Sequence, residues 1–204
     1  HIATDYPLVF TPSNVERLRI MAVDGKVVAH VAAVPRIAMA GPDRFGVAMI
    51  AHAGTHQQYR HRGYATRCLR DAHRVISDCG CSAAVLWTEE DTFRFYRYFG
   101  WEAVASQGEG FVLTVADRDR FRPADLNVSV LPYVDKRAID ELMKLHCTEL
   151  WRIERDDRQA RALFRLPKIS VYWAENADSE NACRQRAYLV RGTGSNKPGI
   201  IEAV

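Results

Sequence analysis

The sequence lacks the features that mark membrane, secreted and zinc proteins. No apolar run among its 204 residues approaches the roughly 20 that a membrane-spanning helix needs. The N-terminal stretch has no basic segment followed by an apolar one, so we expect no secretory signal. The five cysteines are an odd number, and no pair of C-x-x-C motifs occurs, which disfavours a disulfide framework and a structural zinc site. We therefore expect a cytoplasmic protein with reduced thiols, no metal and no membrane partner.

A surplus of charge of one sign is also missing. The 28 basic and 25 acidic side chains are interspersed and leave a formal net charge of +3. Nucleic-acid-binding proteins concentrate basic residues on one surface, so nucleic acid is disfavoured as a partner. Apolar residues make up 48% of the chain, which suffices for a packed core. The sequence therefore predicts a globular protein, and it leaves homo-oligomerisation open.

Two common nucleotide-binding motifs are absent, but one short segment has the properties of an anion site. The chain contains neither G-x-x-x-x-G-K-[ST] nor G-x-G-x-x-G. The segment YRHRGYA, residues 59–65, instead places Arg60 and Arg62 before Gly63, and a helical pattern begins at Tyr64. The N–H groups at a helix N-terminus attract phosphate, glycine lets the phosphate approach the backbone, and arginine can bind it in a bidentate manner. We therefore expect this loop to bind a phosphate group.

Upstream of this loop, the residue pattern predicts antiparallel strands. Leu18, Ile20 and Ala22 alternate with Arg17, Arg19 and Met21, which predicts a first strand within residues 16–23. A second strand is predicted over residues 26–34 after the turn signal Asp24–Gly25. Pro35 is expected to interrupt the second strand, and GVAMIAHAG, residues 46–54, predicts a third. Three antiparallel strands in sequence are therefore expected before the loop.

Downstream of the loop, the apolar spacing changes to that of a helix. Apolar residues at steps of three and four predict a helix from Tyr64 to Cys79, and Gly80 stands where a C-terminal cap belongs. SAAVLWT predicts a buried strand, and FRFYRYF predicts a short helix capped by Asp91 or Thr92. WEAVAS and GFVLTVA predict two closing strands. The order to residue 117 is therefore that of a mixed α/β domain.

Residues 118–204 are predicted to form a second domain after residues 1–117. A polar, proline-containing linker, DRDRFRPADL, precedes a predicted strand in VSVLPY. Asp135 is expected to cap a helix whose apolar face extends to Leu150, and a basic helix follows over residues 155–165. ISVYWAE, RAYLVRG and GIIEAV predict three further strands.

The loop and the aromatic segment that follows it resemble two motifs of the GNAT superfamily of N-acetyltransferases. Arg60, Gly63 and Ala65 form R-x-x-G-x-A, which is similar to the Q/R-x-x-G-x-G/A loop that binds the pyrophosphate of acyl-CoA in that family. FYRYFGW, residues 95–101, is similar to the family's F-Y-x-x-x-G-F/Y segment. The resemblance spans about residues 15–117 and implies a mixed, mostly antiparallel sheet flanked by helices. It also implies transfer of an acetyl group from acetyl-CoA to a primary amine by direct attack.

The resemblance implies a role for each candidate site residue. Tyr96 occupies the position of the general acid that protonates the leaving CoA thiolate, and a phenol with a pKa near ~10 can donate that proton at neutral pH. The backbone amides of His52, Ala53 and Gly54 are implied to hold the pantetheine arm of acetyl-CoA and to polarise the thioester carbonyl. The residues implied to bind its pyrophosphate are Arg60, His61, Arg62, Gly63, Tyr64 and Ala65.

The general base is the part of this mechanism that the sequence leaves open. GNAT enzymes often place a glutamate on the strand before the loop, and VAMIAHA contains none. His52 is one alternative, Glu89 or Glu90 acting through water is another, and an acceptor that arrives neutral needs no base. The missing base, and the absence upstream of the helices that normally build the acceptor site, keep a second hypothesis open. That hypothesis is a non-catalytic acyl-CoA-binding or regulatory module.

The second part of the sequence has the element order with which a GNAT domain begins. Its strand, two helices and further strands would make a partial second GNAT-like unit after the first. The whole sequence resembles part of a tandem GNAT protein of the enhanced-intracellular-survival type. The alternative is that the second part completes the first domain, and the acceptor amine stays undefined.

Overall fold

The computed structural model describes residues 2–104, 126–131, 134–176, 186–192 and 199–203. The chain divides into two compact units, one made of His1–Leu86 and Asn127–Val204 and the other of Trp87–Leu126. We describe each unit by itself. No helix in the described ranges has the length and apolar character needed to cross a membrane.

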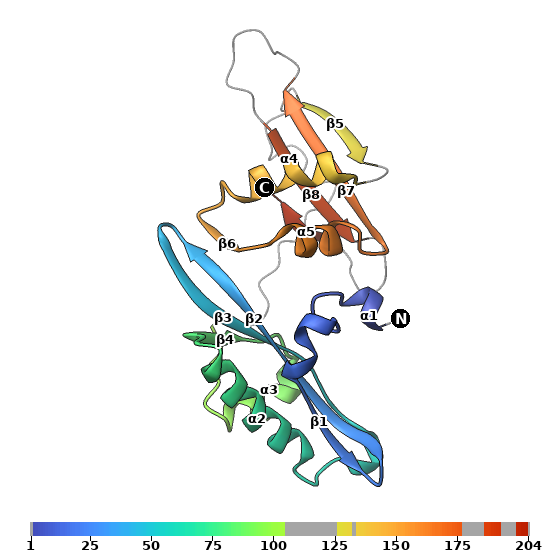
Figure 1. Cartoon of the computed structure of the whole chain (residues 1–204), viewed down its shortest axis with the longest axis vertical. Coiled ribbons are helices and arrows are strands. Elements are labelled where there is room, and N and C mark those ends of the chain that lie inside the picture. Colours follow the sequence, from blue (N-terminus) through green and yellow to red (C-terminus); the bar gives the residue numbers. More distant parts are fainter. Residues whose placement is uncertain (1, 105–125, 132–133, 177–185, 193–198, 204) are drawn as a thin grey trace. The chain divides into compact units, whose positions relative to one another are not determined.

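The first unit contains a five-stranded sheet in which four strands follow the order of the chain. Strands β1 (Leu18–Val23), β2 (Lys26–Ala40), β3 (Asp43–Thr55) and β4 (Ala83–Val85) lie side by side, as Figure 1 shows. The β1–β2 and β2–β3 pairs are antiparallel, and β3–β4 is parallel. Asp24 and Gly25 form the predicted turn with φ of 49° and 74°, as a tight two-residue hairpin requires. The predicted hairpin is confirmed.

Pro35 does not interrupt the second strand, so that expectation was wrong. Strand β2 runs unbroken through it, and Pro35 pairs with Ala48 of β3. On the opposite edge of β2, the pairing with β1 ends at Ala32 and the pairing with the next neighbour begins at Ala38. A proline, which has no N–H group, is tolerated where a strand edge has no ladder partner, and among the described residues Pro35 lies at such a place.

The neighbour at Ala38 is β6 (Trp151–Ile153), a short strand that the sequence pattern did not predict. It pairs antiparallel with residues 38–40. Strand β4 is also shorter than expected, because its pairing with β3 covers only Val47–Met49. Its run is exposed rather than buried, and Trp87 just beyond it is 80% exposed. Apolar character alone was therefore a poor guide to burial in this segment.

Helix α2 (Tyr64–Asp78) packs on the first sheet, and Gly80 follows it at φ 68°, as predicted. The guanidinium of Arg19 on β1 lies 3.3 Å from the carboxylate of Asp71 on α2. Val31 pairs with Arg19 across the β1–β2 ladder, so the side chains of both residues face this helix. Neighbouring side chains along a strand point to opposite faces, so Ala32 on β2 faces away from α2. Ala32 packs against Val9.

Val9 belongs to the N-terminal segment, which contains α1 (Ile2–Asp5) and the 3-10 helix η1 (Pro12–Arg17). The segment is anchored to the sheet by an apolar cluster of Val9, Phe10, Leu18, Ala32, Val34, Met49 and Ala51. The first sheet therefore has α2 on one face and the N-terminal segment on the other.

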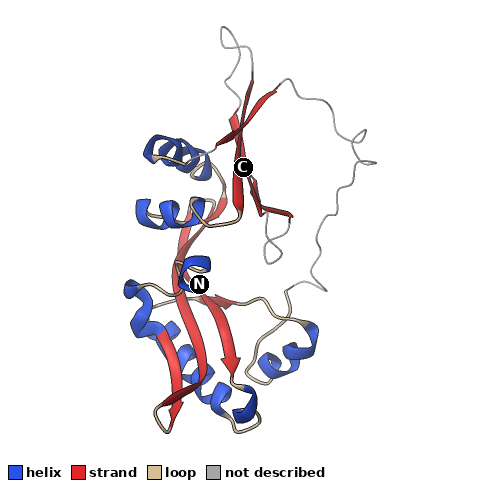
Figure 2. Ribbon diagram, turned by 90° about the vertical axis from the view of Figure 1, so that its right-hand side faces the viewer, coloured by secondary structure: helices blue, strands red, loops and turns tan. Residues whose placement is uncertain are grey.

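The first unit also contains a four-stranded sheet in the order β5 (Leu126–Leu131), β7 (Ile169–Asn176), β8 (Arg186–Gly192) and β9 (Gly199–Ala203). Helices α4 (Lys136–His146) and α5 (Asp157–Phe164) lie on the same face of this sheet (Figures 1 and 2). Their shared core consists of Val134, Ile139, Leu142, Ala160, Phe164, Val171, Tyr188 and Val190. The predicted strand, two helices and further strands are present in the described residues, although the unpredicted β6 stands between α4 and α5 in the chain.

Asp135 caps α4 as predicted, because its side chain accepts a hydrogen bond from the Ala138 N–H at 2.8 Å. Leu150 was wrongly placed on the apolar face of this helix. The helix ends at His146, and Leu150 lies beyond it with 67% of its surface exposed.

The second unit contains α3 (Glu90–Arg97). The prediction that Asp91 or Thr92 caps this helix was wrong, because both residues lie inside it. Glu89 is the N-cap, and the Thr92 hydroxyl donates to the Glu89 carbonyl at 3.0 Å within the first turn. Residues 101–104 form no strand, and the rest of the two predicted closing strands lies outside the described residues, as does most of the predicted linker.

Candidate functional site

Strand β3 changes register just before the candidate loop. Ala51 pairs with Ala32 and Gly54 pairs with His30, so three steps along β3 correspond to two along β2. His52 lies within this β-bulge and has φ of 50°, an uncommon value for a residue other than glycine. A bulge leaves one residue unpaired and re-aims its side chain, and bulges are frequent beside functional sites.

The last residues of β3 are not paired with β4 in the described structure. The parallel ladder joins Val47–Met49 to Ala83–Val85 and continues no further in the described residues. Backbone N–H and C=O groups of β3 beyond Met49 are therefore not paired to β4 on that edge. An extended ligand with amide groups of its own can take the place of the missing strand.

The segment that follows β3 is held by hydrogen bonds within itself and to β2 and β3. Its 3-10 turn η2 (Gln57–Tyr59) is capped by the side chain of His56, and the His56 N–H donates to the Val28 carbonyl at 2.8 Å. The Arg60 Nε donates to the Thr55 carbonyl at 3.4 Å. These bonds fix the start of the loop on the ends of β2 and β3.

Two residues with positive φ shape the end of the loop. His61 has φ of 62°, and Gly63, with φ of 77°, is the N-cap of α2. No side chain caps this helix, and its first turn contains no acidic residue. A Cβ atom added to Gly63 would meet no described atom within 4 Å, so the space in front of the helix is open. Unpaired N–H donors, the positive end of the helix dipole and open space together make an anion site.

The basic side chains of the loop are exposed around this helix end. The guanidinium of Arg62 lies 5.3 Å from the ring centroid of Tyr59, and the Tyr59 and Tyr64 rings are 6.4 Å apart. Ala65 lies half-buried in the first turn of α2. The structure thus brings the predicted residues 60–65 together at one helix N-terminus, directly after the bulge that holds residues 52–54.

Sequence reasoning missed the side chains around His52. Its ring lies 4.0 Å from Tyr6 and 5.1 Å from Phe10, measured between centroids. The ring of His30 covers Gly54, because a Cβ atom there would lie 3.2 Å from the His30 Cε1 atom. Burial, and secondarily the neighbouring His30, lower the pKa of His52 from its ordinary value of 6.5. No sequence signal links Tyr6 or Phe10 to residue 52, because their contact depends on the bulge.

Tyr96 lies on α3, in the second unit, and its neighbours there are aromatic. The rings of Phe95 and Trp101 are 5.1 Å and 6.3 Å from it. Tyr96 is buried, and this burial raises the pKa of its phenol above the ordinary value of 10. Glu89 and Glu90, the alternative bases, are both exposed at the start of the same helix. Their solvation fits a cap or a surface role.

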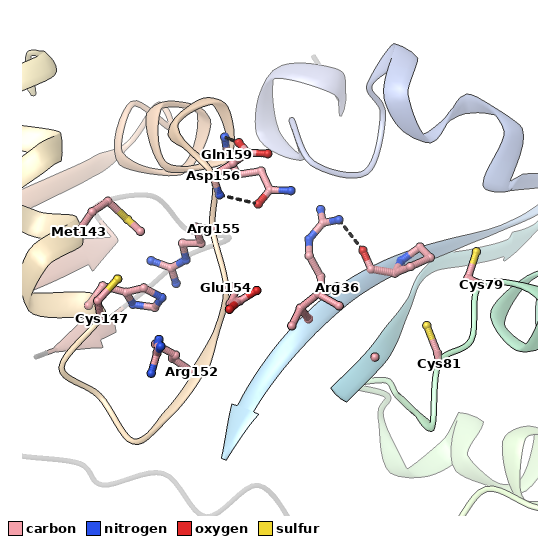
Figure 3. Close-up of a pocket in the computed structure, with 14 residues that line it drawn as sticks. Arg36, Cys79, Cys81, Met143, Cys147, Arg152, Glu154, Arg155, Asp156 and Gln159 are labelled. Carbon is pink, nitrogen blue, oxygen red and sulfur yellow. Dashed lines mark hydrogen bonds between the residues drawn. The ribbon is translucent and has the colours of Figure 1, made fainter. Parts of the chain in front are cut away.

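A separate cavity of about 520 Å³ lies in the first unit (Figure 3). Its lining includes Arg36, Cys79, Cys81, Cys147, Arg155 and Asp156, and none of the predicted site residues. Arg36 donates to the Pro35 carbonyl at 2.7 Å and to the Leu8 carbonyl at 3.3 Å. In the part of the chain that the structure describes, no group of three His, Cys, Asp or Glu side chains is arranged to hold a metal ion.

Comparison with known proteins identifies the kind of domain that carries the loop. Residues 12–104 match the family model of the acetyltransferase (GNAT) domain. No curated protein matches the sequence. A GCN5-related N-acetyltransferase from Anabaena variabilis aligns with 100% of this chain and 54% of its own length, with a TM-score of 0.61 and 18% identity. A GCN5-related N-acetyltransferase from Kribbella flavida aligns with 90% of this chain and 45% of its own, with a TM-score of 0.57 and 17% identity.

At these identities the likeness to the two solved structures concerns the fold alone, and this chain spans about half the length of each. The expected fold class is confirmed, since the structure is a mixed α/β arrangement with a mostly antiparallel sheet flanked by helices. The bulged strand β3, the open loop at Gly63 and helix α2 all lie within the matched segment. Residues 12–104 are thus similar to an acetyltransferase domain of the GNAT type.

Proposed function

We propose that this chain binds acetyl-CoA at the Gly63 loop and transfers its acetyl group to a primary amine by direct attack. The observation that carries the proposal is the open N-terminus of α2, which has no capping side chain and no acidic residue in its first turn. The loop stands in a segment that matches a GNAT acetyltransferase domain. The family match supports an acetyltransferase domain but does not specify the acceptor, so transfer to an amine is part of the proposal.

The pyrophosphate of acetyl-CoA fits the chemistry of the loop. The N–H groups of the first turn of α2 would donate to its oxygens, and the exposed guanidinium groups of Arg60 and Arg62 would add charge. The absence of a side chain at Gly63 leaves room for the phosphate against the backbone, which is supported by the open space there. His61 and Tyr64 would take part through their backbone N–H groups.

The thioester would lie along the free edge of β3. The backbone N–H groups of Ala53 and Gly54 beside the bulge would donate to the pantetheine arm and to the oxyanion of the tetrahedral intermediate. Direct attack is favoured over a cysteine-bound intermediate by the state of two thiols. Burial raises the pKa of Cys68 and of Cys81, so both stay protonated and weakly nucleophilic at neutral pH.

Tyr96 is the proposed general acid. The phenol must be protonated before it can donate a proton to the CoA thiolate, and burial raises its pKa and so favours the protonated form. A thiol has an ordinary pKa of about 8.5, so the leaving thiolate is a plausible recipient of this proton. The motif FYRYFGW, in which Tyr96 stands, supports the assignment.

The proposal is tested by placing a carboxylate in the open space. Gly63→Glu should lower the affinity for acetyl-CoA by more than about 100-fold, because a negative side chain would occupy the phosphate position. Gly25→Glu is the matched control, since Gly25 also has positive φ, 74°, and open space around its Cβ position. Isothermal titration calorimetry measures both. Equal affinity in the two variants would remove the site assignment.

A non-catalytic acyl-CoA-binding or regulatory module is the second candidate function. It is favoured by one observation, that β3 carries no carboxylate beyond Asp43 at its first residue. Tight binding of acetyl-CoA without transfer to any member of an amine panel would support this alternative. Release of free CoA thiol that depends on an added amine would exclude it.

We also propose that residues 1–117 form the acetyl-CoA-binding domain and that residues 118–204 begin a second GNAT-like unit. The element order β5, α4, β6, α5, β7, β8 and β9 supports this division, apart from the short strand β6, which pairs with β2 of the first sheet. So does the alignment of the whole chain with little more than half of the Anabaena variabilis protein. Separate expression of residues 1–117 tests it, and retained acetyl-CoA binding by that fragment is the expected result.

A further inference from the structure

Three of the four described cysteines line the cavity of Figure 3. Cys79 and Cys81 flank Gly80 at the end of α2, and Cys147 follows the last residue of α4. The fourth, Cys68, is buried on α2 and does not line the cavity. None of the four forms a disulfide. Thiols are therefore gathered at a place that the proposed function does not use.

The turn at Gly80 keeps Cys79 and Cys81 within the separation that a disulfide spans. Gly80 has φ of 68°, and its N–H donates to the Ser77 carbonyl at 2.9 Å. The Cys81 N–H donates to the Ile76 carbonyl at 3.2 Å. The Cα atoms of residues two apart in a chain are about 5 to 7 Å from each other, and a disulfide joins Cα atoms about 4.4 to 6.8 Å apart. The two thiols can therefore be joined without unfolding the end of α2.

Strand β3 holds this turn in place. The Ser82 N–H donates to the Gly46 carbonyl at 2.8 Å. A Cβ atom at residue 46 would lie 3.1 Å from the Cα atom of Cys81, so the glycine lets β3 approach the turn closely. The backbone of Cys81 is therefore held against β3 while its side chain lines the cavity.

The two thiols of the turn differ in accessibility. Cys79 is exposed, whereas Cys81 is half-buried. Burial, and secondarily the neighbouring Cys79, raises the pKa of the Cys81 thiol. A thiolate is the group that attacks a disulfide, so Cys79 is suited to react first with a dissolved disulfide. Cys81 is suited to react second, because an attack within one turn benefits from a high effective concentration.

Arginine side chains line the same cavity, from β2 and from the segment before α5. They are Arg36, Arg152 and Arg155. Burial lowers the pKa of the Arg36 guanidinium, and the nearby carboxylate of Asp156 offsets part of this effect. A guanidinium that has lost part of its hydration gains from an anionic partner and can bind a carboxylate through two N–H groups.

The two carboxylates of the lining already have partners. Glu154 accepts from the Arg44 guanidinium at 3.0 Å, and Asp156 accepts from the Gln159 N–H at 2.8 Å. Both acids are thus engaged with groups of the protein. The cavity therefore favours an anionic ligand over a cationic one.

We propose that Cys79 and Cys81 form a thiol–disulfide exchange site that takes an anionic low-molecular-weight disulfide and becomes an intramolecular disulfide itself. The cavity of about 520 Å³ has the size of a small-molecule site and accommodates a group as large as a tripeptide. The inference is independent of the proposed function, because neither cysteine belongs to the Gly63 loop. Each of the two can fail while the other stands.

The exchange balances in two steps. The Cys79 thiolate attacks one sulfur of R–S–S–R, the S–S bond breaks, a mixed disulfide forms on Cys79, and R–S⁻ leaves. The Cys81 thiolate then attacks the Cys79 sulfur, the Cys79–Cys81 bond forms, and the second R–S⁻ leaves. The two leaving thiolates take up the two protons that the cysteines lost. Two protein thiols are oxidised by two electrons, and one small disulfide is reduced to two R–SH.

Treatment of the whole chain with glutathione disulfide tests the site. Trypsin cleaves after Arg74 and Arg94, so a single peptide, residues 75–94, contains both cysteines of the turn. Mass spectrometry without reduction should show this peptide lighter by two hydrogen atoms, with both thiols protected from alkylation. A disulfide to the peptide that contains Cys147 would overturn the pairing. A glutathione adduct that never proceeds to the intramolecular bond would overturn the second step.

Serine variants separate the two roles. Cys81→Ser should stop the reaction at the first step, so a glutathione adduct should accumulate on Cys79. Cys79→Ser should react at least about tenfold more slowly, because the exposed thiol is lost. Cys68→Ser is the matched control outside the cavity, and it should react at the wild-type rate. Gly63→Glu should do the same, which separates this site from the proposed acetyl-CoA loop. Equal rates in Cys79→Ser and the wild type would contradict the assignment of the attacking thiol.

The preference for an anion is tested with cystamine, a disulfide that carries positive charge. The initial rate with glutathione disulfide is divided by the rate with cystamine, and the same ratio for the urea-unfolded chain corrects for the reactivity of the reagents. The corrected ratio should exceed about 10 at low ionic strength and should fall toward 1 in the double variant Arg152→Gln, Arg155→Gln. A corrected ratio near 1 in the wild type would overturn the anionic class.

Discussion

The helices of the two sheets begin in opposite ways. In the second sheet, Asp135 accepts from the Ala138 N–H at the start of α4, and Asp156 with Gln159 forms a capping box at the start of α5. In the first sheet, α2 begins at Gly63 with no capping side chain and no acid in its first turn. N–H donors at the starts of α4 and α5 bond to side chains inside the protein, whereas α2 has no capping side chain and would offer its donors to the proposed phosphate.

The open start of α2 has a small cost in stability. A glycine N-cap is only a few tenths of a kcal/mol less favourable than aspartate, whereas alanine costs about 1 kcal/mol. A glycine N-cap therefore leaves the first N–H groups of a helix without a side-chain partner and lowers its stability only slightly. This contrast predicts two different results. Adding a cap to α2 should weaken ligand binding, and removing the cap of α4 should lower stability.

The largest effect is expected from closing α2. Gly63→Asp would bring to α2 the type of carboxylate that begins α4 and α5, and it should lower acetyl-CoA affinity by more than about 100-fold through repulsion of the pyrophosphate. The thermal shift that acetyl-CoA produces in the wild type should disappear. Differential scanning fluorimetry with and without acetyl-CoA measures this. A preserved shift would show that the N-terminus of α2 is not the phosphate site.

The second largest effect is expected from a substitution in α3, whose first turn contains acidic residues, unlike that of α2. Glu90 and Asp91 stand in its first turn, so we expect α3 to contribute chemistry rather than phosphate binding. Tyr96→Phe should lower kcat by about 10- to 100-fold and leave acetyl-CoA affinity nearly unchanged, because only the proton donor is lost. Steady-state kinetics and calorimetry on the same preparation measure the two quantities. Equal kcat in both proteins across the pH range would exclude Tyr96 as the acid.

Opening α4 should have a smaller effect, and on stability alone. Asp135→Ala removes the acceptor of the Ala138 N–H and should lower the free energy of unfolding by about 1 kcal/mol. Acetyl-CoA affinity should stay that of the wild type. Urea denaturation followed by circular dichroism gives the free energy. A loss of affinity with no loss of stability would contradict the comparison between the two regions.

Local signals in the sequence were sufficient for the parts that depend on neighbouring residues. The Asp24–Gly25 turn, the span of α2 ended by Gly80 and the Asp135 cap each rest on a few consecutive residues, and each is present. The loop residues 60–65 lie together for the same reason. Their role as an acetyl-CoA site stays a prediction.

Features that depend on distant pairing were missed or wrongly predicted. Pro35 is accommodated because β1 and β6 leave the edge of β2 beside it without a described partner. Strand β6 was missed because it forms by pairing with β2, which is far away in the sequence. The bulge that turns His52 toward Tyr6 arises from the register between β2 and β3, which one-residue differences decide. A sequence pattern can show the alternation of side chains along a strand. It does not show where a β-bulge adds a residue to one strand of a pair.

The smallest expected effect is a pH dependence of stability caused by one half-buried histidine, His73. Burial lowers the pKa of His73 on α2 below the ordinary 6.5, so the folded protein holds this ring neutral where the unfolded chain begins to protonate. The stabilisation is complete above the unfolded value and is lost as the pH falls toward the folded one. The free energy of unfolding should therefore decrease as the pH falls through and below 6.5. His73→Gln should reduce that decrease in urea titrations at several pH values, and an identical slope in both proteins would show that His73 does not contribute.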